Sequence, residues 1–103
     1  MAKRLRPDTR TVRRLREEGW LCDLTERRTG LISHDWLGVA DVVAVHPDRG
    51  VLAVQATSRG NVSARVKKLE AAEEVLAVLR RCGIGIQVWG WDDKPDPRVV
   101  DLS

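Results

Sequence analysis

The chain has 103 residues, of which 43% are hydrophobic and 32% charged, and its formal net charge is +3. This length and composition are typical of one small soluble domain spanning residues 1–103, and they exclude a disordered chain. No apolar run approaches the roughly 20 residues that span a bilayer, and no signal-peptide core follows the basic start. We therefore expect no membrane partner and a cytoplasmic location, as for a bacterial or phage protein that acts there.

The basic residues are unevenly distributed along the chain. Residues 1–16 hold seven Lys or Arg side chains against a single acid, Asp8, and a second basic group follows residue 58. Clustered Lys and Arg gain affinity for nucleic acids because they release counterions from phosphates. The alternative is a solvated helix face preceded by a flexible basic tail over residues 1–8. Charge alone leaves both interpretations open.

The first half of the chain predicts a helix followed by strands. A surface helix over 9–18 is capped by Asp8 or Thr9 and ended by Gly19. Three segments then follow in order: a strand with one wet face, a loop or short strand, and a hairpin of two buried strands joined by the turn PDRG. These segments are 20–26, 27–38, and 39–46 with 51–57.

The second half predicts a helix between strands. Apolar residues recur at three- and four-residue steps over 64–81, with Asn61 or Ser63 as the cap, which indicates one amphipathic helix. A strand over 84–91 and a short edge strand over 99–102 complete the chain. The order of elements predicts an α/β fold with a mixed sheet flanked by helices.

Asp41 lies inside the predicted buried strand 39–46, where an ionised carboxylate is costly unless it is paired or binds a metal. With a period of two residues, Asp41 and Gln55 are expected to meet at one end of the hairpin. Together with the carbonyl oxygen of Ala56, they could form an oxygen cage for Mg²⁺. The alternative is a structural Asp that accepts a hydrogen bond from a backbone N–H or from an arginine.

The order of elements, with Asp41 followed by Gln55-Ala56-Thr57, resembles the PD-(D/E)XK nuclease superfamily, and especially its Holliday-junction-resolvase-like branch. The resemblance covers roughly residues 9–91. It implies the restriction-endonuclease-like α-β-β-β-α-β core, in which an Asp on the second strand precedes a (D/E)-x-K motif on the third. Asp41 matches that Asp, and Gln55-Ala56-Thr57 falls where the (D/E)-x-K motif belongs.

The chain departs from the family motif at two positions. Gln55 replaces an acid, which should weaken divalent affinity, and Thr57 replaces the lysine that positions or activates the attacking water. Lys67 or Lys68 on the following helix could supply that charge, and Asp35 or Glu26 could supply a second carboxylate. The resolvase branch also adds an acid on the first helix. Asp8, Glu17 and Glu18 are the candidates for it here, and none is assigned to the site.

These observations predict a DNA endonuclease that depends on Mg²⁺ or Mn²⁺, uses no small-molecule cofactor, and could act as a homodimer. The start of the second helix follows a polar turn, and exposed N–H groups there suit a phosphate. The predicted DNA contacts are Arg10, Arg13, Arg14, Ser58, Arg59, Asn61, Ser63, Arg65, Lys67 and Lys68. Because Gln55 and Thr57 alter the motif, a DNA-binding or assembly module that has lost catalysis is the alternative.

Overall fold

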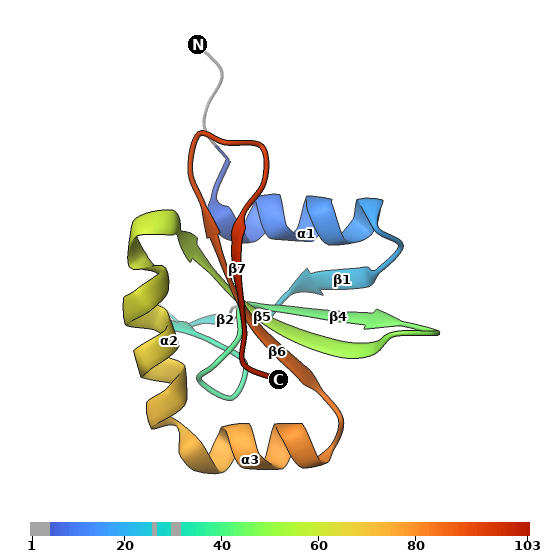
Figure 1. Ribbon diagram of the computed structural model, residues 1–103, viewed down its shortest axis with the longest axis vertical. Helices are drawn as coiled ribbons and strands as arrows, with labels where there is room; N and C mark the ends of the chain where they lie inside the picture. The colour runs from blue at the N-terminus through green and yellow to red at the C-terminus, as the bar shows by residue number, and fades with distance from the viewer. Residues whose placement is uncertain (1–4, 26, 30–31) are drawn as a thin grey trace.

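A computed structural model describes residues 5–25, 27–29 and 32–103, and its centre is a five-stranded sheet (Figure 1). The strand order is β1-β4-β5-β6-β7. Strand β5 is the longest and lies at the centre of the sheet. The bounds are β1 (Leu21–Leu24), β4 (Val42–His46), β5 (Gly50–Ser58), β6 (Gly85–Trp91) and β7 (Arg98–Asp101).

The sheet is mixed because a helical crossover joins β5 to β6, whereas the other neighbouring strands pair antiparallel. Strands β4 and β5 form an antiparallel hairpin, in which His46 pairs with Gly50 and Val42 with Val54. Strands β5 and β6 are parallel, as expected when helices separate two strands of one sheet. Strands β1 and β7 add antiparallel edges. The predicted α/β class, the hairpin and the last edge strand are confirmed.

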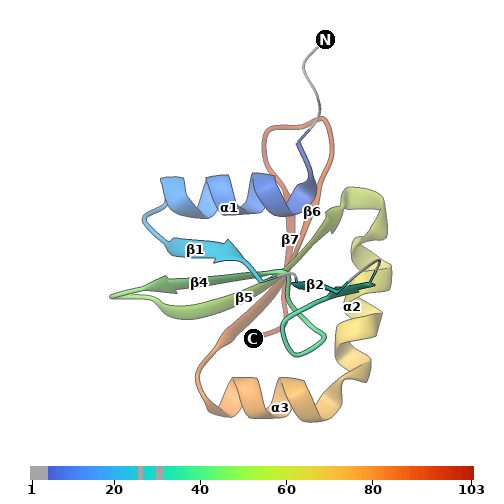
Figure 2. The ribbon, with the colours of Figure 1, turned by 180° about the vertical axis from the view of Figure 1, so that it is seen from behind.

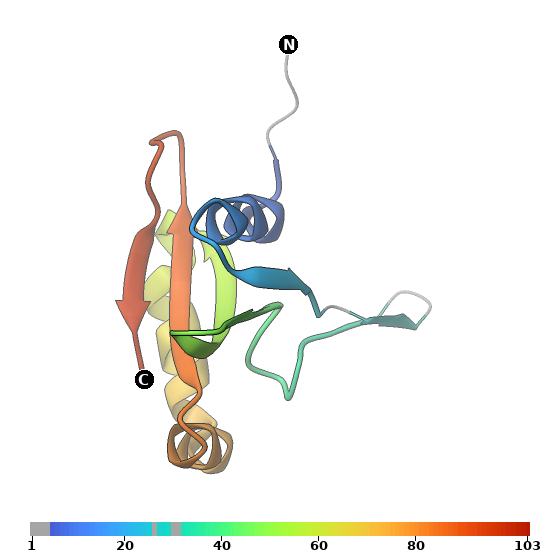
Figure 3. The same cartoon turned by 90° about the vertical axis from the view of Figure 1, so that its right-hand side faces the viewer.

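Helices cover both faces of the sheet (Figures 2 and 3). Helix α1 (Pro7–Glu17) packs on one face, where Val12 and Leu15 join a cluster that includes both Trp89 and Trp91. Helices α2 (Val62–Ala71) and α3 (Glu73–Arg81) pack on the other face through a second cluster. No helix in the described part of the chain is long and apolar enough to cross a membrane.

The two clusters assign each side chain of β5 to a face. Leu52 and Val54 belong to the cluster under α1, whereas Ala53 belongs to the cluster under α2 and α3. Because successive side chains of a strand point to opposite faces, Ala56 lies on the α1 face. Gln55 and Thr57 lie on the α2 face for the same reason. This alternation decides which predicted site residues can meet.

The helix predicted over 64–81 is wrong as a single element. Ala72 has ψ 54°, which interrupts the helical hydrogen bonds, and the chain continues as α3. The apolar periodicity persists through the break since Leu69 and Leu76 both enter the same cluster. A change of direction at one residue lets the two short helices follow the twisted sheet, and periodicity alone cannot reveal it.

Two other boundaries differ from those predicted. Helix α1 begins at Pro7, two residues early, so Asp8 lies in its first turn rather than in a tail or at the cap. Proline at the first helical position has no N–H that needs a partner, which favours this start. The predicted irregular segment contains a small hairpin of β2 (Arg27–Thr29) and β3 (Ile32–His34).

Gly90 allows the start of α2 to approach the sheet closely. A Cβ atom at this position would overlap Val62 Cγ2 and would lie 2.9 Å from Arg59 Cα. We expect Gly90→Ala to lower the free energy of unfolding by about 1–3 kcal/mol, as overpacking does elsewhere. Urea denaturation measures this loss. The matched control is Gly60→Ala, whose Cβ would meet nothing within 4 Å, and equal stabilities of the two variants would contradict the prediction.

Candidate functional site

Asp41 lies immediately before β4 rather than inside it, which corrects its predicted place in the middle of a strand. Its backbone still belongs to the sheet: its N–H donates to the Val54 oxygen (3.0 Å), and its carbonyl accepts from the Thr25 N–H (2.9 Å). The residue is therefore fixed between β1 and β5 where the regular ladder of β4 ends. Its side chain projects from a rigid backbone.

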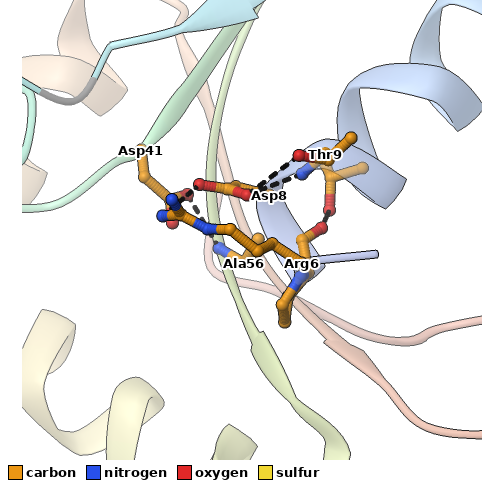
Figure 4. A network of polar contacts seen from close by, with 7 residues as sticks. Arg6, Asp8, Thr9, Asp41 and Ala56 are labelled. Carbon is orange, nitrogen blue, oxygen red and sulfur yellow. Dashed lines mark hydrogen bonds and ion pairs between the residues drawn. The ribbon is translucent and has the colours of Figure 1, made fainter. Parts of the chain in front are cut away.

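The carboxylate of Asp41 replaces a missing strand partner. Strand β5 continues beyond Val54, the last residue paired with β4, so the N–H of Ala56 has no β4 carbonyl to bind. Asp41 Oδ1 accepts that N–H at 2.9 Å (Figure 4). A buried N–H without a partner would cost about 1–3 kcal/mol, so this contact extends the sheet by one hydrogen bond. It matches the structural alternative drawn from the sequence.

A second carboxylate, Asp8, lies beside Asp41. Asp8 is 4% exposed, and its Oδ1 accepts the N–H of Thr9 at 2.7 Å. Its Oδ2 forms an ion pair with Arg6 Nη2 at 3.0 Å. In Figure 4 the Arg6 side chain extends between the carboxylates of Asp8 and Asp41. We call Asp8 and Asp41 the acid pair, because α1 and the start of β4 bring them together from distant parts of the sequence.

The environment of Asp41 favours its neutral form. Burial raises its pKa from 3.8 to about 7, and the hydrogen bond from the Ala56 N–H opposes this shift in part. The negative charges of Asp35 and Asp8 raise the pKa further. Asp35, predicted as a second carboxylate of the site, therefore lies within electrostatic range of Asp41. A pKa near 7 in a buried acid is a common property of functional sites.

The structure does not bring Gln55 into the acid pair. Gln55 is 3% exposed on the α2 face, and its Oε1 has no hydrogen-bond partner among the described residues. Ala56 contacts Asp41 through its N–H, whereas the prediction used its carbonyl. Thr57 is buried on the α2 face as well. Glu26, also predicted as a ligand, lies outside the described residues.

The predicted lysines lie across the sheet from Asp8. Lys67 and Lys68 are exposed on α2, whose buried residues Val62 and Leu69 pack on the face opposite α1. Neither lysine is placed to serve the acid pair. The cation beside the acid pair is instead Arg6, which sequence reasoning missed. An arginine in a run of basic residues carries no signal that sets it apart from its neighbours.

The predicted DNA contacts divide into two groups. Arg10, Arg14 and Arg59 bind the loop between β6 and β7, so these side chains already have intramolecular partners. The other predicted contacts remain at the surface of α1 or around the start of α2, where Arg65 is half-buried and the rest are exposed. Those exposed residues are Arg13, Ser58, Asn61, Ser63, Lys67 and Lys68. Asn61 is the N-cap of α2 but makes no side-chain capping hydrogen bond.

The acid pair meets the minimum requirement of a magnesium site. Mg²⁺ keeps several waters and binds through one or two carboxylates together with substrate phosphates. Asp8 and Asp41 supply two carboxylates from rigid elements, with Asp35 in electrostatic range. No cluster of three Asp, Glu, His or Cys side chains suited to a metal occurs within residues 5–25, 27–29 and 32–103. A cation would therefore depend on two carboxylates and would have to displace Arg6 from Asp8.

Comparisons with protein-family models, with curated proteins and with solved structures found no match to this chain.

The raised pKa of Asp41 makes stability depend on pH. Because its folded pKa of about 7 exceeds the unfolded value of 3.8, its contribution is fully present below about pH 4 and is lost as the pH rises through 7. Asp41→Asn keeps an acceptor for the Ala56 N–H but cannot ionise. The free energy of unfolding of this variant, relative to that of wild type, should rise by on the order of 2–4 kcal/mol from pH 4.5 to pH 8. Urea denaturation at both pH values measures the difference.

Asp48→Asn is the matched control, because Asp48 is exposed in the turn between β4 and β5. Its stability should follow the pH dependence of wild type. If Asp41→Asn also follows wild type, the pKa of Asp41 is not raised in the folded protein.

Proposed function

We propose that this chain is a metal-dependent DNA endonuclease that hydrolyses phosphodiester bonds, with a preference for branched substrates such as Holliday junctions. The observation that carries the proposal is the acid pair: the buried Asp8 of α1 and the half-buried Asp41 just before β4 lie side by side (Figure 4). Keeping both carboxylates ionised side by side is unfavourable unless a cation neutralises them, and the raised pKa of Asp41 expresses that cost. The resemblance to PD-(D/E)XK nucleases rests first on the order of elements and includes the same Asp41.

In this proposal the residues of the acid pair hold Mg²⁺ or Mn²⁺. The bound ion would polarise the phosphodiester and lower the pKa of a bound water. Asp41 is held in place by the Ala56 N–H, and Asp8 by the Thr9 N–H, so both carboxylates are oriented before a cation arrives. Such orientation avoids the reorganisation that a flexible site would need during the reaction.

Arg6 provides the positive charge that Thr57 cannot. It already contacts Asp8 at 3.0 Å, and its side chain is 60% exposed, so it can move toward a phosphate once a cation binds the carboxylates. A guanidinium can donate two parallel hydrogen bonds to phosphate oxygens. In the proposed mechanism Arg6 thus stabilises the charge that develops on the phosphate, in place of a motif lysine.

A DNA-binding module without catalysis is the second candidate, and a specific observation favours it. The carboxylate oxygens of the acid pair already have protein partners: the Ala56 N–H, the Thr9 N–H and Arg6. These contacts can stabilise both acids without a metal. The absence of a motif lysine at position 57 agrees with this candidate. It predicts salt-sensitive DNA binding that needs no divalent cation.

Substitution of the acid pair tests the endonuclease directly. We expect wild type to cleave branched DNA more rapidly than linear duplex in Mg²⁺ or Mn²⁺. Asp8→Asn and Asp41→Asn should each lose about 100-fold or more in rate, since each removes a charged ligand worth several kcal/mol. Asp48→Asn, which neutralises an exposed turn residue, should cleave at the wild-type rate. Gel assays with end-labelled substrates give the rates.

Calorimetric titration of Mn²⁺ into the same proteins separates the two candidates without an activity assay. The endonuclease predicts one site that is lost in Asp8→Asn and in Asp41→Asn but kept in Asp48→Asn. Cleavage that survives in both acid-pair variants would contradict the proposal. DNA binding by wild type without Mn²⁺ binding or cleavage would establish the second candidate in its place.

A further inference from the structure

Three arginines from two elements converge on the loop between β6 and β7, residues 92–97. We call Arg10, Arg14 and Arg59 the arginine row. Arg10 donates to the carbonyl oxygens of Asp92 (2.6 Å) and Lys94 (3.1 Å). Arg14 donates to Pro95 and Arg59 to Asp96, again at carbonyl oxygens, at 2.7 and 2.8 Å. Figure 1 shows this loop rising beside the start of α1.

Carboxylates of the same loop add charge to these contacts. Arg14 Nη1 lies 3.1 Å from Asp96 Oδ1, and Arg59 Nε lies 2.9 Å from Asp92 Oδ2. The pKa of Asp92 is lowered, first by the N–H of Lys94 and further by Arg59. The loop sequence is Asp-Asp-Lys-Pro-Asp-Pro, so it is acidic and its two prolines have no N–H. The loop therefore presents many acceptors and few donors to side chains that can only donate.

Two members of the arginine row, Arg10 and Arg14, are also organised by contacts that do not involve the loop. The Arg10 guanidinium lies 4.3 Å from the centroid of the Trp91 ring, and that of Arg14 lies 5.6 Å from it. Trp91 is itself fixed, because it is buried and its Nε1 donates to Thr11 Oγ1 at 2.8 Å. Stacking on a rigid aromatic ring limits the orientations of a guanidinium. Arg10 and Arg14 would keep their geometry if the loop moved away, whereas Arg59 binds the loop itself.

The loop and the acid pair adjoin the same elements. Asp8 and Arg14 are six residues apart on α1, about 9 Å along the helix axis. Arg59 follows the end of β5, three residues after Ala56, whose N–H binds Asp41. A nucleic-acid backbone that reaches the acid pair would therefore pass close to the arginine row. Its phosphates would compete with the loop for the same donors.

We propose that the β6–β7 loop is an internal mimic of a phosphate backbone, which covers the arginine row and must be displaced when DNA binds. This inference rests on DNA as the partner in the proposed function, but it does not depend on catalysis. Backbone carbonyls and the carboxylates of Asp92 and Asp96 occupy positions that phosphate oxygens would take. The contacts are individually weak because they lie near solvent, so a polyanion can replace them. The loop thereby limits binding to ligands with several phosphates.

The test compares two variants with the same change in net charge. Asp92→Asn/Asp96→Asn removes both carboxylates that pair with the arginine row. Asp23→Asn/Asp48→Asn removes two exposed carboxylates on β1 and in the β4–β5 turn. A labelled branched duplex is titrated with each protein at one fixed salt concentration, without divalent cations. We expect the loop variant to bind about tenfold more tightly than the control variant.

Hydrogen exchange of the loop amides provides a second measurement on wild type. Addition of the duplex should speed exchange at the Lys94 amide, because its hydrogen bond to Asp92 Oδ1 (2.9 Å) loses the support of the Arg59–Asp92 pair. The single variant Asp96→Asn guards against misfolding of the double variant, because the Asp96 side chain is 80% exposed. It should bind the duplex more tightly than Asp48→Asn.

Two results would overturn the loop proposal. One is equal affinities of the loop and control variants, including the case in which neither binds. The other is a Lys94 amide that stays as protected with DNA as without it. Tighter binding by the loop variant in a protein that cleaves nothing would support the loop proposal while refuting the endonuclease.

Discussion

The hydrogen bond from the Ala56 N–H to the Asp41 carboxylate fixes the position of the acid on which the candidate site depends. Strand β5 extends beyond its antiparallel neighbour β4, and a side chain completes the ladder at the point where the neighbouring backbone leaves it. The bond holds a half-buried acidic group in place, and its partial removal from water raises the pKa of that group to about 7 although the bond itself opposes the shift. Everything proposed for the site follows from the fixed position of this carboxylate.

Helix α1 links that carboxylate to the rest of the fold. One side of the helix buries Val12 and Leu15 against the sheet. Its first turn places Asp8 beside Asp41, and the next two turns place Arg10 and Arg14 against the β6–β7 loop. Most arginines of this helix therefore serve as intramolecular donors, which explains why a basic segment need not be an open nucleic-acid surface.

The architecture could be predicted because it depends on short-range patterns. The β-branched run before His46 and the turn after it define a hairpin, and periodic apolar residues define the helices that cover the sheet. The break at Ala72 was missed because the apolar period continues through it. Helix α1 starts two residues before its predicted start because Pro7 favours the first helical position.

The site was predicted only in part, for a physical reason. Asp41 could be identified since a carboxylate in an apolar strand is costly wherever the strand lies. Its partners depend on the face of β5 that each residue occupies, and alternation gives Gln55 to the α2 face while Ala56 faces α1. Asp8 and Arg6 were not assigned because acidic and basic residues at a helix start are common for reasons of local charge alone.

Paramagnetic broadening by Mn²⁺ tests most directly whether the acid pair is a cation site. The NMR signals to follow are the backbone amide of Ala56 and the side-chain carboxyl carbons of Asp8 and Asp41. A cation held by the pair predicts that these three signals broaden first, at Mn²⁺ concentrations well below that of the protein. Broadening confined to the exposed carboxylates of the β6–β7 loop, with the Ala56 amide unchanged, would contradict the account.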